Sequence, residues 1–178
     1  MTDSEALPER TPRSATDRIR RANLVAAASG FDGFVSFEWI KNSGATVSGA
    51  LLAWERGDLA ALPVGVAWDV VHMARPVGWR TVTALRTAGA AVGPVLHSER
   101  HVDLLVPVGS VEGWDQDDAT VLAVGDMLDV PHPAITAPQT QHARTWIVPP
   151  SGSTLTDGAA LYESYAAARA SLHLDAVR

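Results

Sequence analysis

Two histidines, His97 and His101, stand four residues apart in a chain that contains no cysteine. On a helix this spacing would place both imidazoles on one face, as in helical zinc sites. The surrounding segment, PVLHSERHVDLLVPVG, is strand-like and predicts two short strands joined by a turn. No third ligand is indicated, so we expect the two histidines to flank a surface turn, with no metal site and no cofactor.

A lone carboxylate, Asp69, lies in the apolar stretch LPVGVAWDVVHM. A two-metal site on a strand needs a second acid on the same face, but Val71 and Met73 are the next residues on that face. We interpret Asp69 as a structural acid bonded to backbone donors or to an arginine near the strand start, because an unpaired buried carboxylate is costly. A remnant role in a nucleotide pocket is the functional alternative.

Acidic and aromatic residues offer further candidate binding groups. The turn WDQDD, Trp114–Asp118, lacks the glycine and the distal glutamate of a calcium loop, which favours a solvated acidic turn. Arg144 can bind a phosphate or carboxylate through two N–H groups, or form a salt bridge at the rim of a pocket. The candidate ligand-binding residues are Arg144, Trp146 and His97, and the candidate catalytic residues are Asp69 and His101.

The elements that must position these residues follow from hydrophobic periodicity and from Gly and Pro breaks. Helices are predicted at about 15–30, from Ser43 or Ser48 to Gly57, at 78–91 and at about 157–174. The second helix is expected to bury Leu51, Leu52 and Trp54. The aromatic segment FDGFVSFEWI fits an edge strand or a loop better than a helix.

An interior strand is predicted at Val66–Met73, ended by Pro76 and Gly78. With the helix at 78–91 and the next strand it forms a βαβ-like unit. The strand-turn-strand unit that follows has its turn at Ser98–Arg100. Because strands outnumber helices in the second half, the sequence predicts an α+β domain with a mixed sheet flanked by helices.

The composition limits the classes of function. With 178 residues, of which 47% are hydrophobic, the chain suffices for one compact core, so we expect a flexible leader at 1–14 and a single domain at 15–178. No membrane-spanning segment or signal peptide is recognisable, which predicts a cytoplasmic protein. The net charge is −6 and Lys41 is the only lysine, which argues against nucleic acid as a partner. The preference for Arg over Lys and the many alanines are typical of GC-rich bacteria such as actinobacteria.

Three segments, LPVGVAWDVVHM, GPVLHSERHVDLLVPVGS and RTWIVPPSG, follow one another between Ala60 and Ser153. Together they resemble an abbreviated N-terminal domain of the bifunctional primase/polymerases (prim-pol) of actinobacteria. The resemblance implies a primase/polymerase-like core in which one strand ends in Asp-x-Asp, a histidine-bearing strand follows and a VPPS-like segment closes the core. Here His72, Met73 and Ala74 stand where the acids of the family would fall, and the Ser-x-His pattern becomes Ser98-x-x-His101.

These departures predict a domain without the metal-binding acids, which acts as a non-catalytic regulatory or protein-binding module. Its acidic charge favours a protein partner, with Arg10–Arg21 as a segment that could dock on an acidic surface; a nucleotide is possible, and a membrane is not expected. One alternative is a small enzyme with a pocket between the sheet and Trp114–Asp118, using Asp69 or His101 as acid or base on a nucleotide-like or other small molecule. Another is an assembly subunit. Its interface would be the apolar face of the last helix, with Leu161, Tyr165, Ala168 and Leu172.

Overall fold

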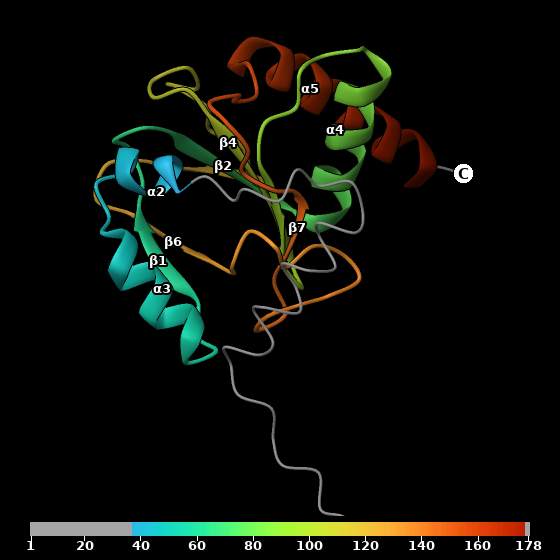
Figure 1. The fold of residues 1–178 in the computed structure, drawn as a ribbon. Helices are drawn as coiled ribbons and strands as arrows, with labels where there is room; N and C mark the ends of the chain where they lie inside the picture. Colours follow the sequence, from blue (N-terminus) through green and yellow to red (C-terminus); the bar gives the residue numbers. More distant parts are fainter. Residues whose placement is uncertain (1–36, 177–178) are drawn as a thin grey trace, which may run out of the picture.

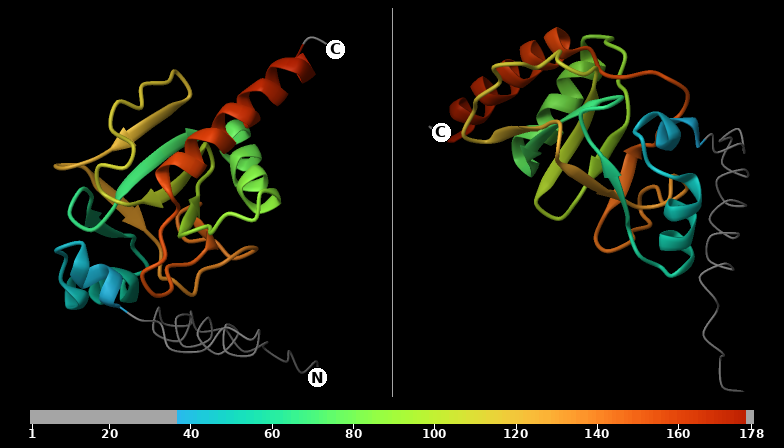
Figure 2. Two further views of the ribbon diagram at one scale, coloured as in Figure 1. Left: turned by 90° about the horizontal axis from the view of Figure 1, so that it is seen from above. Right: turned by 90° about the vertical axis from the view of Figure 1, so that its left-hand side faces the viewer.

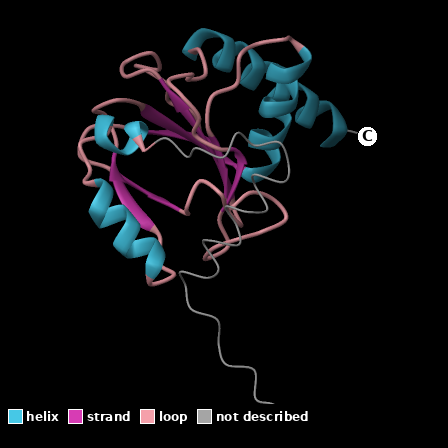
Figure 3. Cartoon of the chain, viewed as in Figure 1, coloured by secondary structure: helices cyan, strands magenta, loops and turns pink. Residues whose placement is uncertain are grey.

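The computed structural model of the protein describes residues 37–176, which form helices and two antiparallel sheets (Figures 1 and 3). The α+β class predicted from the sequence is confirmed. The predicted helix at 15–30, the leader at 1–14 and the segment Arg10–Arg21 lie outside the described residues.

The larger sheet has the strand order β5-β2-β4-β3-β7, and each neighbouring pair is antiparallel. Its strands are β2 Asp69–Ala74, β3 Val95–His97, β4 His101–Val106, β5 Ala119–Leu122 and β7 Thr145–Val148. The prediction of a mixed sheet is therefore wrong for the described residues. The reason is that β4 inserts between β2 and β3, so these two strands run parallel, as in a βαβ unit, but each pairs with β4 instead of with the other.

Two helices cover one face of this sheet, α4 Arg75–Thr87 and α5 Gly158–Ala176 (Figure 2). Strands and helices meet in an apolar cluster that includes Val71, Met73, Leu104, Leu85 and Leu161. On α5 the buried residues include Leu161, Tyr165 and Ala168. These three residues, which the assembly-subunit alternative places at an interface, therefore pack against the sheet and α4 inside the molecule, and the alternative itself stays a prediction.

The other face of the sheet packs against a second layer. This layer contains α2 Glu38–Asn42, α3 Val47–Glu55 and the small sheet of β1 Ala60–Pro63 and β6 Met127–Val130. Trp54 and Trp146 lie in the apolar cluster between the layers. Their indole Nε1–H groups donate to the backbone oxygens of Val130 and Pro131, at 3.0 and 3.1 Å, so both rings are fixed in the core.

Some local predictions in the first half are wrong. Glu38–Ile40 begin α2, where a strand or a loop was expected. In α3, Leu51 and Leu52 are exposed, because the helix turns Ala50 and Trp54 toward the core. The N-cap is Thr46, whose hydroxyl accepts a hydrogen bond from the Gly49 N–H at 3.3 Å, instead of Ser43 or Ser48.

The strand ends at Ala74, just before Pro76 as predicted, but the helix begins at Arg75 instead of at 78, so Pro76 and Gly78 both belong to α4. Proline fits the first turn of a helix, where its missing N–H has no partner to lose. Gly78 lets α4 approach the sheet, since a Cβ at this position would lie 2.6 Å from the Cβ of Val102. The predicted β2 is confirmed with a later start, at Asp69, because Val66 is 60% exposed in the preceding turn.

Candidate functional site

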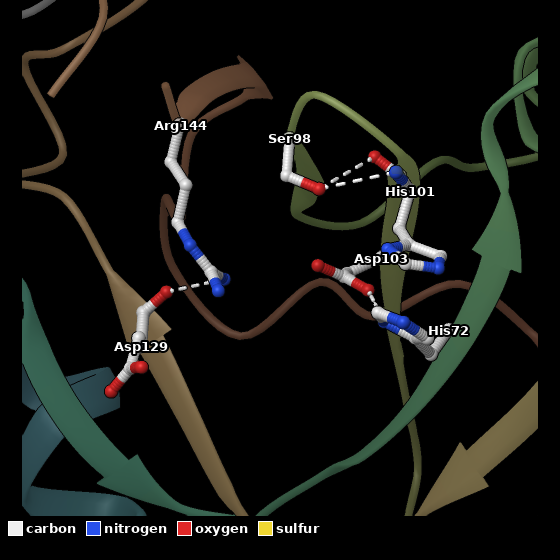
Figure 4. Close-up of polar contacts among 6 residues, drawn as sticks. All are labelled: His72, Ser98, His101, Asp103, Asp129 and Arg144. Carbon is white, nitrogen blue, oxygen red and sulfur yellow. Dashed lines mark hydrogen bonds and ion pairs between the residues drawn. The ribbon is translucent and has the colours of Figure 1, made fainter. Parts of the chain in front are cut away.

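Polar side chains gather on the sheet face turned away from α4 and α5, where β2 ends and β4 begins. His72 on β2 lies opposite Asp103 on β4, and His101 shares the face of Asp103 because it is two residues away. His72 Nδ1 and Asp103 Oδ1 are 2.5 Å apart. The rings of His72 and His101 have centroids 3.9 Å apart and an interplanar angle of 32°. Figure 4 shows the three side chains side by side on the two strands.

The alternation of β4 places these groups. Val102 and Leu104 point into the helix-side cluster, so His101 and Asp103 point to the opposite face. Asp103 is only 1% exposed, and a buried carboxylate requires a hydrogen-bond donor. His72 supplies that donor at Nδ1, which leaves Nε2 as its second ring nitrogen for other partners.

The β3–β4 turn holds His101 in place. Ser98 Oγ accepts a hydrogen bond from the His101 N–H at 3.1 Å, and the Ser98 N–H donates to the His101 carbonyl at 2.9 Å. This pattern closes the tight turn at Ser98–Arg100 that the sequence predicts. Ser98 therefore positions the first residue of β4 at the edge of the polar cluster.

Arg144 lies in the segment before β7; in Figure 4 its guanidinium lies between Asp129 and the cluster, on the side of Asp103, and its charge acts on His101. One of its Nη atoms donates to the backbone oxygen of Asp129 at 2.9 Å. The other N–H groups of a guanidinium stay available for a ligand under this arrangement.

A strained turn carries Arg144. Gln141 and Arg144 exchange two backbone hydrogen bonds of 2.9 Å around His142 and Ala143, which have φ values of 48° and 59°. Left-handed backbone is unfavourable for residues other than glycine. Side-chain hydrogen bonds from Gln141 to the Asp58 carbonyl, at 2.7 Å, and between His142 Nε2 and the Gly57 carbonyl, at 2.9 Å, anchor the turn on the end of α3.

Burial is the main cause that lowers the pKa of His101, and the neighbouring His72 lowers it further. Asp103 acts in the opposite direction, while the positive charges of Arg100 and Arg144 add to the lowering. At neutral pH, His101 is therefore mainly a neutral imidazole. An anion that binds beside it would favour its protonated form.

Not all of the site residues predicted from the sequence lie in the cluster of His72, His101 and Asp103. The structure brings His101 and Arg144 into the cluster, but Asp69 lies on the helix-facing side of β2. Asp69 Oδ2 accepts a hydrogen bond from the Gly109 N–H at 2.8 Å, so the expected bond to a backbone donor is present. Its Oδ1 is buried without a partner among the described residues.

His97 and Trp146 are also separated from the cluster. His97 faces the helix side, with its ring 5.3 Å from that of Trp79 on α4. Burial, and then the charge of Arg75, lower the pKa of His97. Trp146 has no exposed surface, which leaves no part of its ring open to a ligand, so its assignment as a ligand-binding residue is corrected to a core residue.

The acidic turn Trp114–Asp118 packs against α5. The ring centroid of Trp114 lies 5.2 Å from that of Tyr162 and 5.0 Å from that of Tyr165. The Tyr165 hydroxyl donates to Asp118 Oδ1, and Arg169 Nε lies 3.5 Å from Asp118 Oδ2. Burial, together with this hydrogen bond, raises the pKa of Tyr165 to about 12. The turn is thus part of the helix-side packing, away from His101.

His72 and Asp103 are site residues that were not predicted from the sequence. A usable signal was present, because HVDLLV is a predicted strand with an acid at an interior position, and DVVHMA is a neighbouring strand with a histidine. Their contact depends on the register of β2 against β4, which pairs residues 31 positions apart in the chain. Neither strand specifies that register by itself.

In the part of the chain that the structure describes, no group of three or more His, Asp or Glu side chains is arranged to hold a metal ion. Among the helices between residues 37 and 176, none has the length and hydrophobicity to cross a membrane. Comparison of the chain with protein-family models, with curated proteins and with solved structures finds no match.

Proposed function

We propose that the protein is a non-catalytic binding module for a small phosphate-bearing molecule of the nucleotide class. The phosphate would lie between Arg144 and the pair His72–His101. The observation that carries this proposal is the placement of two histidines and an arginine at one half-buried end of the sheet, with the carboxylate of Asp103 already bound to His72.

The chemistry of the three side chains suits an anion. A guanidinium binds phosphate oxygens through parallel N–H groups, and a protonated imidazole adds a further charged donor. Asp103 does not oppose the ligand strongly, because its carboxylate is 1% exposed and its Oδ1 is held by His72. Arg144 is anchored through one Nη, so its position requires little further ordering when a ligand binds.

The resemblance to the prim-pol core supports the nucleotide class and a regulatory role. In that family paired acids hold the metal ions of phosphoryl transfer. At the corresponding strand end this chain has His72, Met73 and Ala74. A site with imidazoles in place of acids keeps the ability to bind phosphate but not the two-metal chemistry, which is why we propose binding without turnover.

An acid-base enzyme is the second candidate function, and the His72–Asp103 pair favours it. A carboxylate bonded to Nδ1 fixes the tautomer and orientation of an imidazole, so that Nε2 can accept or deliver a proton. His72 is then the acid or base that the pair positions, and of the two candidates predicted from the sequence, His101 lies against His72 whereas Asp69 lies on the other face. A protein partner for Arg10–Arg21 stays a prediction, since that segment lies outside the described residues.

Calorimetric titration of the full chain with sulfate, AMP and ATP tests the binding proposal. We expect Arg144→Gln and His72→Gln to weaken binding about tenfold or more, because each removes a charge-assisted contact. The matched control is Arg80→Gln, which removes an arginine that bonds Ser171 and Asp175 on the helix side. Equal affinity in wild type and Arg144→Gln, or equal weakening in Arg80→Gln, would contradict the proposal.

The pH dependence separates the role of His101 from a general charge effect. Sulfate keeps its charge between pH 5.5 and 8, so its affinity reports the protein groups alone. Since the pKa of His101 is lowered and an anion favours its charged form, affinity should rise as the pH falls and decline as the pH rises. His101→Gln should flatten this profile. Release of inorganic phosphate from ATP, abolished by His72→Gln, would favour the enzyme instead.

A further inference from the structure

A pocket of about 120 Å³ lies at the opposite end of the same sheet face, where β2 begins and β4 ends. Its walls include Trp39, Trp68, Pro94, Leu105 and Pro150. Leu105 is two residues beyond Asp103 on β4, which separates the two places by about 7 Å along the strand. None of the residues that line the pocket belongs to the cluster of His72, His101, Asp103 and Arg144.

The lining selects an uncharged, flat molecule. It contains no Asp, Glu, Lys, Arg or His, so a charged ligand would lose its hydration without gaining an ionic partner. Two indoles and two prolines supply flat apolar surfaces that suit a ring. The volume corresponds to a single six-membered ring, since cavities of roughly 150 Å³ bind benzene.

Two buried donors at this pocket add a polar requirement. Trp39 and Trp68 are 7% and 3% exposed, and each indole Nε1–H is buried with no acceptor among the described residues. In the same apolar cluster, Trp54 and Trp146 donate to the backbone oxygens of Val130 and Pro131. Buried polar groups in proteins normally have a partner. Three indole N–H groups among the described residues lack an acceptor: those of Trp39 and Trp68 line the pocket, and that of Trp114 lies on the other side of the sheet, against α5.

We infer that this pocket binds a neutral six-membered ring that carries carbonyl oxygens, the chemistry of a pyrimidinedione such as uracil. The ring packs between the indole and proline surfaces, and its carbonyl oxygens accept hydrogen bonds from the indole N–H groups of Trp39 and Trp68. Ser153 and Asn42, which also line the pocket, offer polar groups to the ring N–H atoms. This inference rests on contacts separate from the proposed phosphate site and stands or falls independently of it.

The test compares uracil with benzene as probes of the full chain, by NMR of the indole N–H resonances. Uracil should bind saturably and shift the indole signals of Trp39 and Trp68, while those of Trp54 and Trp146 stay in place. Benzene should bind without a comparable shift, because it offers no acceptor of similar strength. Absence of saturable uracil binding, or equal shifts of all four signals, would overturn the inference.

Trp68→Phe keeps an aromatic wall but removes one donor. We expect it to weaken uracil about tenfold and to leave benzene affinity within twofold of wild type. Trp79→Phe, on α4 at the far side of the sheet, is the matched control and should change neither affinity. Equal weakening of both probes by Trp68→Phe would show apolar burial alone and reject the carbonyl requirement. Ala67→Leu, which fills the pocket from another wall, should abolish binding of both probes; retained binding would place them elsewhere and overturn the inference.

Discussion

The two faces of the five-stranded sheet differ in how far they are covered. On the helix face, Val71, Met73 and Leu104 have no exposed surface, because α4 and α5 cover the strands. On the other face, α2, α3 and the small sheet cover the end near Trp68 and Leu105, while the His72 side chain at the opposite end is 30% exposed. The same strands supply both faces, so the polar cluster lies where the second layer no longer covers the sheet.

Where other elements cover a sheet face completely, some buried polar atoms lack a hydrogen-bond partner. Asp69 and His97 are on the helix face, and each has one buried polar atom without a partner among the described residues. On the other face, His72 and Asp103 at the open end satisfy each other, whereas the indole N–H groups of Trp39 and Trp68 at the covered end have no acceptor among the described residues. Polar groups at the open end can therefore be arranged for ligands, whereas those on the helix face are constrained by packing.

Leu104→Ala should have the largest effect and would test whether the two faces act independently. Truncation of a fully buried leucine costs about 3 kcal/mol through lost burial and a cavity. The melting temperature should fall by roughly 6–12 °C at this chain length. Sulfate affinity at temperatures where the variant is folded should match wild type, because Leu104 points away from Asp103 and His101. A parallel loss of sulfate binding would show that the faces are coupled.

A similar loss is expected from acidification of the second layer. His132 packs with its ring centroid 4.9 Å from that of Trp54, and burial lowers its pKa from 6.5 to about 4. The unfolded chain takes up the proton first, so stability is full above about pH 6.5 and falls as the pH decreases toward 4. The loss for this group reaches about 3 kcal/mol, because each pKa unit corresponds to ~1.4 kcal/mol.

Denaturant unfolding at pH 7, 6 and 5 measures this effect. His132→Asn is the matched variant, because an asparagine oxygen can still accept the Ala134 N–H that bonds His132 Nδ1 at 3.1 Å. It should be less stable at pH 7 and show a shallower decline with acid. His173→Asn, at an exposed position of α5, should keep the wild-type slope. A wild-type slope in His132→Asn would contradict the assignment.

The pair His72–Asp103 gives the next effect and sharpens the contrast between the faces. His72→Leu leaves a buried carboxylate without its donor, which costs about 2 kcal/mol. Combining it with Asp103→Leu should restore most of that stability, since no charge then stays buried. Sulfate binding should be weak in both variants, because the imidazole is absent from each. Recovery of sulfate binding in the double variant would exclude His72 from the site.

The smallest effect concerns the turn that carries Arg144. Ala143→Gly should raise stability by about 0.5 kcal/mol, because glycine accepts the φ of 59° with little strain. The same substitution at Ala170, exposed within α5, should lower stability by about 1 kcal/mol. Opposite signs in denaturant unfolding at pH 7 would support the strained turn, and a loss of stability in both variants would contradict it.

The elements predicted best are those that local pattern determines. The β3–β4 turn, the core of β2 and the last helix follow from Gly and Pro breaks and from hydrophobic periodicity. The exposed Leu51 and Leu52 show the limit, because periodicity does not say which face of α3 meets β1. The α+β fold class is predictable from the sequence. The antiparallel strand order of the larger sheet is not, because it depends on the insertion of β4 between β2 and β3.

The candidate site was predictable as residue types, not as an assembly. His101 and Arg144 can be selected from the sequence because an imidazole can transfer a proton and a guanidinium can bind an anion. Their meeting requires the distant pairing of β7 with β3 and a left-handed turn at His142 and Ala143, where the sequence has no glycine to signal it. Asp103 was not predicted as a site residue because it stands between Val102 and Leu104, in a segment whose apolar pattern indicates a buried strand.

The insertion of β4 also sets a temporal order for a chain emerging from the ribosome. Strand β2 is synthesised before both of its partners, β4 and β5, so its two edges and the apolar residues Val70, Val71 and Met73 stay unpaired at first. At ~5–20 residues per second this interval lasts about 2–6 s before β4 is complete. In that interval β2 exposes unpaired backbone groups and apolar side chains, the features that a nascent-chain chaperone binds.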